Sequence, residues 1–117
     1  MVWSGPPTNV IKLNVDAALS TNSASLIVVV RDDCGMFLSG WTKRILVTDP
    51  TIAEASTIVW GLEIAKETNY QKVIIDGDAK VCLDALSGDT STYPWKIQTL
   101  YLNALDLTSY FSFCSFG

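Results

Sequence analysis

Residues 10–19 read Val-Ile-Lys-Leu-Asn-Val-Asp-Ala-Ala-Leu, and the fold class follows from this stretch. Apolar side chains recur at every second position from Ile11 to Leu19, with Lys12, Asn14 and Asp16 between them. A period of two indicates a β-strand that buries one face. We therefore expect a half-buried strand whose polar face presents the carboxylate of Asp16.

Two further strands are expected directly after this one. Residues 24–30 are apolar on both faces, and residues 36–45 follow a turn-forming stretch, 31–35, that ends in glycine. Strands that lie this close in sequence and are joined by short turns form antiparallel meanders. The first third of the chain therefore predicts a three-stranded antiparallel meander.

A helix and a fourth strand come next. Asp49-Pro50 opens the helix, since proline suits a first helical turn. Apolar residues then recur at helical spacing until about residue 68, which predicts one stripe packed on the sheet. Residues 72–78 form a short apolar strand with an acidic end. After a crossover helix, such a strand runs parallel to an earlier strand of the same sheet.

The remaining residues complete an α/β domain. We expect helices over residues 79–86 and 95–107, and a strand rich in aromatic residues over 109–117. The whole chain, 1–117, is long enough for one domain and too short for two. The predicted architecture is a mixed sheet with helices on its faces.

Composition excludes several classes of function. The chain has no histidine and three widely spaced cysteines, which removes Cys/His zinc sites and histidine-dependent hydrolysis. A net charge of −4 argues against a nucleic-acid binder that works by charge alone. There is neither a secretory signal nor an apolar run long enough for a membrane helix. We expect an intracellular protein of the nucleus or cytoplasm, with reduced thiols and no membrane partner.

Three carboxylates are the candidates for chemistry. Asp16 ends the polar face of the first strand, Glu54 lies early in the long helix, and Asp78 ends the fourth strand. Parallel pairing of the first and fourth strands would bring Asp16 and Asp78 together, and a helix packed over them could add Glu54. Such a cluster repels itself unless cations occupy it, and hard oxygen ligands favour Mg²⁺ or Mn²⁺.

Each acid also has a purely local explanation. Asp16 could be a solvated strand residue. Thr51-Ile-Ala-Glu54 matches a helix capping box, and Asp78 could cap the helix that begins at residue 79. From the residues alone, these alternatives stay open.

Four short motifs in order resemble the ribonuclease H family. They are Lys-Leu-Asn-Val-Asp-Ala-Ala at 12–18, Val-Val-Val-Arg-Asp-Asp-Cys-Gly at 28–35, Ala-Glu-Ala at 53–55, and Val-Ile-Ile-Asp-Gly-Asp-Ala-Lys at 73–80. The chain is most similar to plant ribonuclease H-like domains related to retrotransposon reverse transcriptases, whose lead-in resembles Trp-Ser-Gly-Pro-Pro at 3–7.

This resemblance implies a fold, an activity and a site. The fold is ribonuclease H-like, a five-stranded mixed sheet whose fourth and fifth strands run parallel to the first. The activity is endonucleolytic hydrolysis of the RNA strand of RNA–DNA hybrids with Mg²⁺, or Mn²⁺ in its place. Asp16, Glu54 and Asp78 fall on the family's metal-binding catalytic acids, whereas Asp76 is a flanking acid.

The sequence also departs from the family pattern. The family places a last helix, with a fourth acid, after the fifth strand, and this chain reaches Gly117 where that helix would begin. We therefore expect a C-terminally truncated domain without its last helix. The alternative function is a catalytically impaired nucleic-acid-binding or interaction module of the same fold. The uncovered C-terminal strand carries Phe113 and Phe116, which predicts self-association through that strand.

Overall fold

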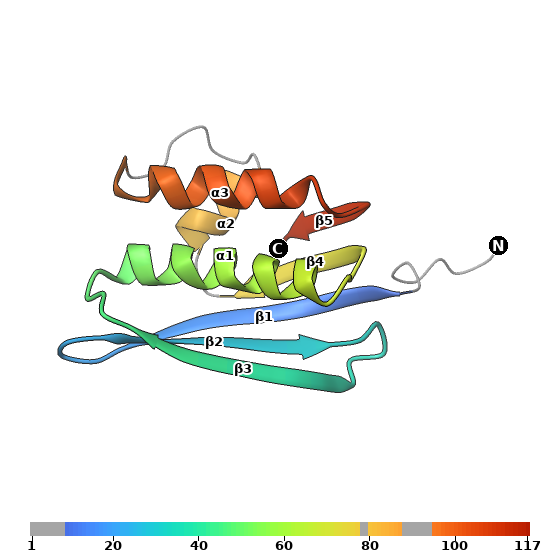
Figure 1. Ribbon diagram of the computed structural model, residues 1–117, viewed down its shortest axis with the longest axis horizontal. Coiled ribbons are helices and arrows are strands. Elements are labelled where there is room, and N and C mark those ends of the chain that lie inside the picture. The colour runs from blue at the N-terminus through green and yellow to red at the C-terminus, as the bar shows by residue number, and fades with distance from the viewer. Residues whose placement is uncertain (1–8, 78–79, 88–94) are drawn as a thin grey trace.

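Five strands form one mixed sheet, and the helices pack over one of its faces (Figure 1). The computed structural model describes residues 9–77, 80–87 and 95–117. The order across the sheet is β3-β2-β1-β4-β5. The elements are β1 Val10–Leu19, β2 Ala24–Arg31, β3 Phe37–Ile45, α1 Pro50–Glu67, β4 Lys72–Gly77, α2 Lys80–Ser87, a 3-10 turn Trp95–Ile97, α3 Gln98–Thr108 and β5 Phe113–Phe116.

The strand pairing confirms the predicted mixed sheet. β1 pairs antiparallel with β2, and β2 pairs antiparallel with β3. β4 pairs parallel with β1 on its other side, and β5 pairs parallel with β4. The central strand β1 therefore has one antiparallel and one parallel neighbour, as the resemblance implied.

The C-terminal strand is shorter than the sequence predicted. β5 begins at Phe113, not at residue 109. The N–H groups of Ser109, Tyr110 and Phe111 each donate to a carbonyl three residues earlier, so these residues form turns that follow α3. Local turn hydrogen bonds therefore replace the first part of the predicted strand.

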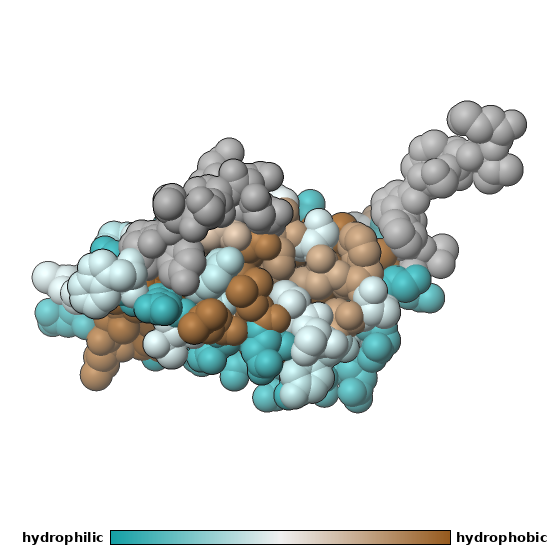
Figure 2. Space-filling view, turned by 90° about the horizontal axis from the view of Figure 1, so that it is seen from above, coloured by the Kyte–Doolittle hydropathy of each residue, from teal (hydrophilic) through white to brown (hydrophobic). Residues whose placement is uncertain are grey.

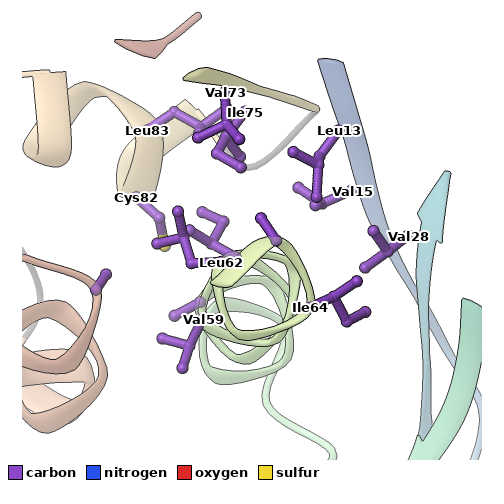
Figure 3. Packing of buried hydrophobic residues seen from close by; sticks show 14 of the residues in the cluster. Leu13, Val15, Val28, Val59, Leu62, Ile64, Val73, Ile75, Cys82 and Leu83 are labelled. Atoms are coloured by element: carbon purple, nitrogen blue, oxygen red, sulfur yellow. The ribbon is translucent and has the colours of Figure 1, made fainter. Parts of the chain in front are cut away.

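Helix α1 is buried on two sides (Figure 1). Alternate residues of β1 and β4, among them Leu13 and Ile75, point from the sheet toward α1 (Figure 3). On the side away from β1, Cys82 and Leu83 of α2 pack near Leu62 and the sheet (Figure 3). The sequence predicted a single apolar stripe on this helix. The structure buries a wider surface, because α2 and α3 cover the side of α1 that the sheet leaves open.

The start of α1 is fixed by Asp49. Its Oδ1 accepts hydrogen bonds from the N–H groups of Thr51 at 2.9 Å and Ile52 at 3.1 Å, which satisfies two donors that the first turn cannot pair internally. Lys96 binds the other carboxylate oxygen of Asp49 at 2.7 Å. The side chain of Asp49 thus links the start of α1 to the turn that precedes α3.

This ion pair predicts a specific dependence of stability on pH. The Lys96 ammonium, which donates to the carboxylate, and then the N–H of Ile52 lower the pKa of Asp49 from its ordinary value of 3.8. A lowered pKa means that this contribution to stability is present above pH 3.8 and is lost as the pH falls through the folded-state pKa. We expect Asp49→Asn, which keeps a capping oxygen, to lower the unfolding temperature slightly at pH 7 and not at pH 2.

The control for this prediction is the Lys96→Met variant. It should show the same loss at pH 7, and the double variant should lose little more than either single variant, because both remove one interaction. Thermal unfolding at several pH values measures these differences. Equal effects of Asp49→Asn at pH 7 and pH 2 would contradict the role assigned to the ion pair.

None of the helices in the described part of the chain is long and apolar enough to cross a membrane.

Candidate active site

Asp16 lies on the helix-free face of β1. Its strand partner is Ile27 of β2, and Lys12 and Asn14 share its face. The side chain is exposed, and within the described residues its carboxylate accepts one hydrogen bond, from the N–H of Ala17 at 2.8 Å. Asp16 therefore presents carboxylate oxygen to solvent near the carboxyl end of the central strand.

The pairing of β1 with β4 ends next to Asp16. The last pair in the register is Val15 with Gly77, and β4 ends at Gly77. Asp78 follows Gly77 directly in the sequence and lies outside the described residues. β1 continues to Leu19, so beyond Val15 no described strand covers its β4 side. Asp16 is therefore the first residue of β1 beyond the described β1–β4 pairs.

Glu54 comes to the same end of the sheet from the helix side. It is half-buried in the second turn of α1. The residue before it, Ala53, is fully buried in a cluster with Ala24 and Leu26, and Ala17 packs against this cluster. The residues adjacent to Glu54 and to Asp16 therefore meet in one packed group. The structure thus brings α1 near its start to the carboxyl end of β1.

The capping explanation for Glu54 is wrong. The N-cap of α1 is Asp49, whereas the capping box would have required Thr51 at that position. Thr51 is the second residue of the helix, so Glu54 lies beyond the reach of a reciprocal capping bond. The sequence Asp49-Pro50 provides a stronger start than Thr51, because aspartate caps well and proline follows it in the first turn.

Cys82 of α2 is a neighbour of Glu54 that the sequence did not indicate. Burial raises the pKa of the Cys82 thiol to about 11, and the negative charge of Glu54 contributes to this increase. Cys82 also packs in the core near Leu62 (Figure 3). Glu54 therefore lies between the end of β1 and the helix that follows β4. No spacing in the sequence connects residues 54 and 82, since only the packing of α2 on α1 brings them together.

The reactivity of the Cys82 thiol reports the negative charge of Glu54. We expect Glu54→Gln to lower the pKa of Cys82 and so to increase its rate of alkylation at pH 9, because the thiolate is the reactive form. Cys114 is the matched control, since burial alone raises the pKa of its thiol to about 11. Mass spectrometry of the folded protein after timed alkylation measures both rates. An unchanged Cys82 rate, or an equal change at Cys114, would contradict the proximity.

Asp76 already has partners in the structure. Lys12 forms an ion pair with Asp76 Oδ2 at 3.2 Å, and Oδ1 accepts the N–H of Gly77 at 2.9 Å. Asp76 lies opposite Asn14 in the register, one pair before the end of β4. Both of its carboxylate oxygens are engaged, which agrees with its interpretation as a flanking acid.

A second acidic group lies in the turn between β2 and β3. Asp32, Asp33 and Cys34 are the one set of at least three acid or thiol groups that the described residues bring within 4.8 Å of one another. Asp32 Oδ1 accepts the N–H groups of Cys34 and Met36, both at 2.9 Å. These hydrogen bonds are those of a tight turn, so the turn itself accounts for the group.

The donor chemistry of the candidate site fits a hard divalent cation. Asp16 and Glu54 both supply carboxylate oxygens, the ligands that Mg²⁺ and Mn²⁺ prefer. Asp16 is accessible and has only one hydrogen bond within the described residues.

A family model described as reverse transcriptase-like matches residues 14–117, which include β1 from Asn14 onward and all of α1 and β4. The chain belongs to this family. The matched range begins at Asn14 and so contains all three candidate acids. No significant match exists among the curated protein sequences compared with this reverse transcriptase-like chain.

Solved structures confirm the ribonuclease H fold of this reverse transcriptase-like domain. RNase H1 from Halobacterium salinarum is 19% identical and superimposes with a TM-score of 0.84, over 92% of this chain and 83% of that one. The N-terminal RNase H domain of a Mycobacterium tuberculosis protein is 20% identical with a TM-score of 0.81, over 92% and 84%. LC11-RNase H1, solved with an RNA/DNA hybrid, is 16% identical with a TM-score of 0.81, over 92% and 83%.

Proposed function

We propose that the chain is a metal-dependent endonuclease that hydrolyses the RNA strand of RNA–DNA hybrids. The reverse transcriptase-like family and the ribonuclease H fold support this function. The observation that carries the proposal is the end of the β1–β4 pairing. Val15 pairs with Gly77, so the next residues along these two parallel strands are Asp16 and Asp78. Glu54 supplies a third carboxylate from the helix that packs at this end of the sheet.

Asp16, Glu54 and Asp78 would hold one or two Mg²⁺ or Mn²⁺ ions. When bound, such ions neutralise charge on a scissile phosphate and activate water for hydrolysis. The rigid parts of the fold orient the acids: Asp16 is on the central strand, and Glu54 follows the buried Ala53. The product would carry a 3′-hydroxyl and a 5′-phosphate. Asn14 lies on the same face as Asp16, two residues away, where it can donate to a ribose 2′-hydroxyl.

A second candidate is a nucleic-acid-binding or interaction module that has lost turnover. The chain has a net charge of −4, and Lys12, which shares the face of Asp16, is paired with Asp76, so neither feature favours binding of a polyanion. Under this alternative the fold and its surface would persist, while the carboxylates would have no role in cleavage.

A single assay separates the two candidates. A hybrid labelled on its RNA strand is incubated with the protein and Mg²⁺, Mn²⁺ or a chelator, and binding is measured in parallel. Cleavage that needs a divalent ion supports the nuclease. Binding without cleavage in any metal, unchanged by Glu54→Gln, supports the module and rejects the nuclease. A DNA duplex of the same sequence tests whether the RNA strand is required.

A further inference from the structure

Strand β3 has a free edge that is long and apolar. It is the outermost strand on one side of the sheet and pairs only with β2 among the described strands. It runs for nine residues, without proline, and most of its side chains are exposed. Phe37 is 60% exposed, Leu38 45% and Trp41 47%. An edge with these properties offers unpaired backbone groups and apolar side chains to a further strand.

The charges along β3 are polarised. The turn before it contains Asp32 and Asp33, and its far end carries Lys43 and Arg44. Arg31 partly offsets the acids, so residues 31–33 have a net charge of −1, against +2 for residues 43–44. Arg44 is exposed and has no ion pair or hydrogen bond with any residue that the structure describes. The two ends lie about 25 Å apart, well beyond the range in which they neutralise each other.

This polarity selects the orientation of a partner strand. If two copies of β3 pair antiparallel, the basic end of each strand lies beside the acidic turn of the other. A parallel pairing would place like charges together. Antiparallel pairing of identical strands also gives a closed two-fold contact, which is the commonest symmetry of small assemblies. A second copy of this chain therefore supplies both the apolar side chains and the opposite charges that the edge lacks.

The opposite edge of the sheet is a weaker candidate. β5 has four residues, less than half the length of β3. Hydrophobic side chains do reach the surface over α3 and β5, as Figure 2 shows, and Phe113 is 40% exposed. No described lysine, arginine, aspartate or glutamate lies within β5 itself, so this edge has no charge pattern that selects a partner.

We propose that two copies of the chain associate through β3, antiparallel across a two-fold axis, and form one continuous sheet. The two β1 strands would then lie about 24 Å apart, since five strand spacings separate them. β1 and β4 are on the side of β2 away from the contact, so the contact would leave both proposed sites uncovered. That last consequence rests on the proposed nuclease site, whereas the association itself does not.

The test is sedimentation of the full chain from about 1 µM to 0.1 mM. We expect a monomer–dimer equilibrium that weakens at high salt. Leu38→Lys should raise the dissociation constant more than about tenfold, because lysine on an edge strand opposes pairing. Phe113→Lys, the same change at a similarly exposed position on β5, should leave it unchanged. A parent chain that stays monomeric throughout, or a dimer dissociated by Phe113→Lys and not by Leu38→Lys, would overturn the proposal.

Charge reversal tests the orientation without disturbing the strand. Lys43→Glu together with Arg44→Glu changes the charge of residues 43–44 from +2 to −2 and should weaken the dimer. Adding Asp33→Lys in the same chain changes residues 31–33 from −1 to +1 and should restore association, because each end then again meets its opposite. All three side chains are exposed, so folding should persist even if Leu38→Lys destabilises the sheet. Failure of Asp33→Lys to restore association would overturn the antiparallel arrangement. None of these readouts depends on nuclease activity, so either proposal can fail alone.

Discussion

Asp16→Asn is expected to lower metal-dependent cleavage of an RNA–DNA hybrid by more than about 100-fold, since loss of residues that only support a metal ligand already costs 10- to 100-fold. The amide is nearly the same size as the carboxylate, and its oxygen can still accept the N–H of Ala17. The exposed position imposes no packing change on β1. The substitution therefore removes the negative charge and little else, so the fold and the unfolding temperature should be unchanged.

Asp106→Asn is the matched control for this experiment. Asp106 is an exposed acid on α3. Its backbone carbonyl, and not its side chain, accepts the hydrogen bonds at the end of the helix. The Asp106→Asn variant should cleave the hybrid at the same rate as the parent chain. If Asp16→Asn retains most of the parental activity at saturating Mg²⁺, Asp16 is not a metal ligand and the proposed site is wrong.

Most of the fold could be predicted because its signals are local. The alternation of apolar and polar residues from Ile11 to Leu19 is complete within one strand. The signal for the start of α1, Asp49-Pro50, is complete within one helical turn. The failures were of two kinds. Residues 109–111 were predicted as the start of the last strand, but their N–H groups form turn hydrogen bonds to the end of α3. The second buried side of α1 arises only when α2 and α3 pack on it, and periodicity within α1 does not encode that contact.

The candidate site was harder to predict than the fold. Asp16, Glu54 and Asp78 are separated by 38 and 24 residues, so their association depends on register and not on local pattern. The structure gives that register for β1 and β4 and brings Ala17 and Ala53 together. The placement of Asp78 remains a prediction. Cys82, next to Glu54, was missed because a buried thiol on a short amphipathic helix looks like ordinary core.

Gly77→Ala is expected to have the largest effect on stability. A Cβ at Gly77 would clash with the backbone carbonyl oxygen of Val15 and would lie 3.0 Å from the Val15 Cγ2 atom. The clash is with the backbone of the central strand, which cannot rotate away as a flexible side chain can. β4 must therefore move away from β1 where the two strands end. We expect a loss of about 3 kcal/mol in the free energy of unfolding, at the upper end for overpacked cores.

The same substitution should impair cleavage beyond its effect on folding. Asp78 follows Gly77, so moving the end of β4 away from Val15 would also move the carboxylate that the proposed site places beside Asp16. Gly40→Ala is the matched control, because it too is a strand glycine, and its Cβ would meet the Phe37 ring at an ordinary 3.5 Å. Urea unfolding and cleavage at a temperature where both variants are folded measure the two effects. Parental activity in folded Gly77→Ala would show that catalysis does not require close approach of β1 and β4 at this point.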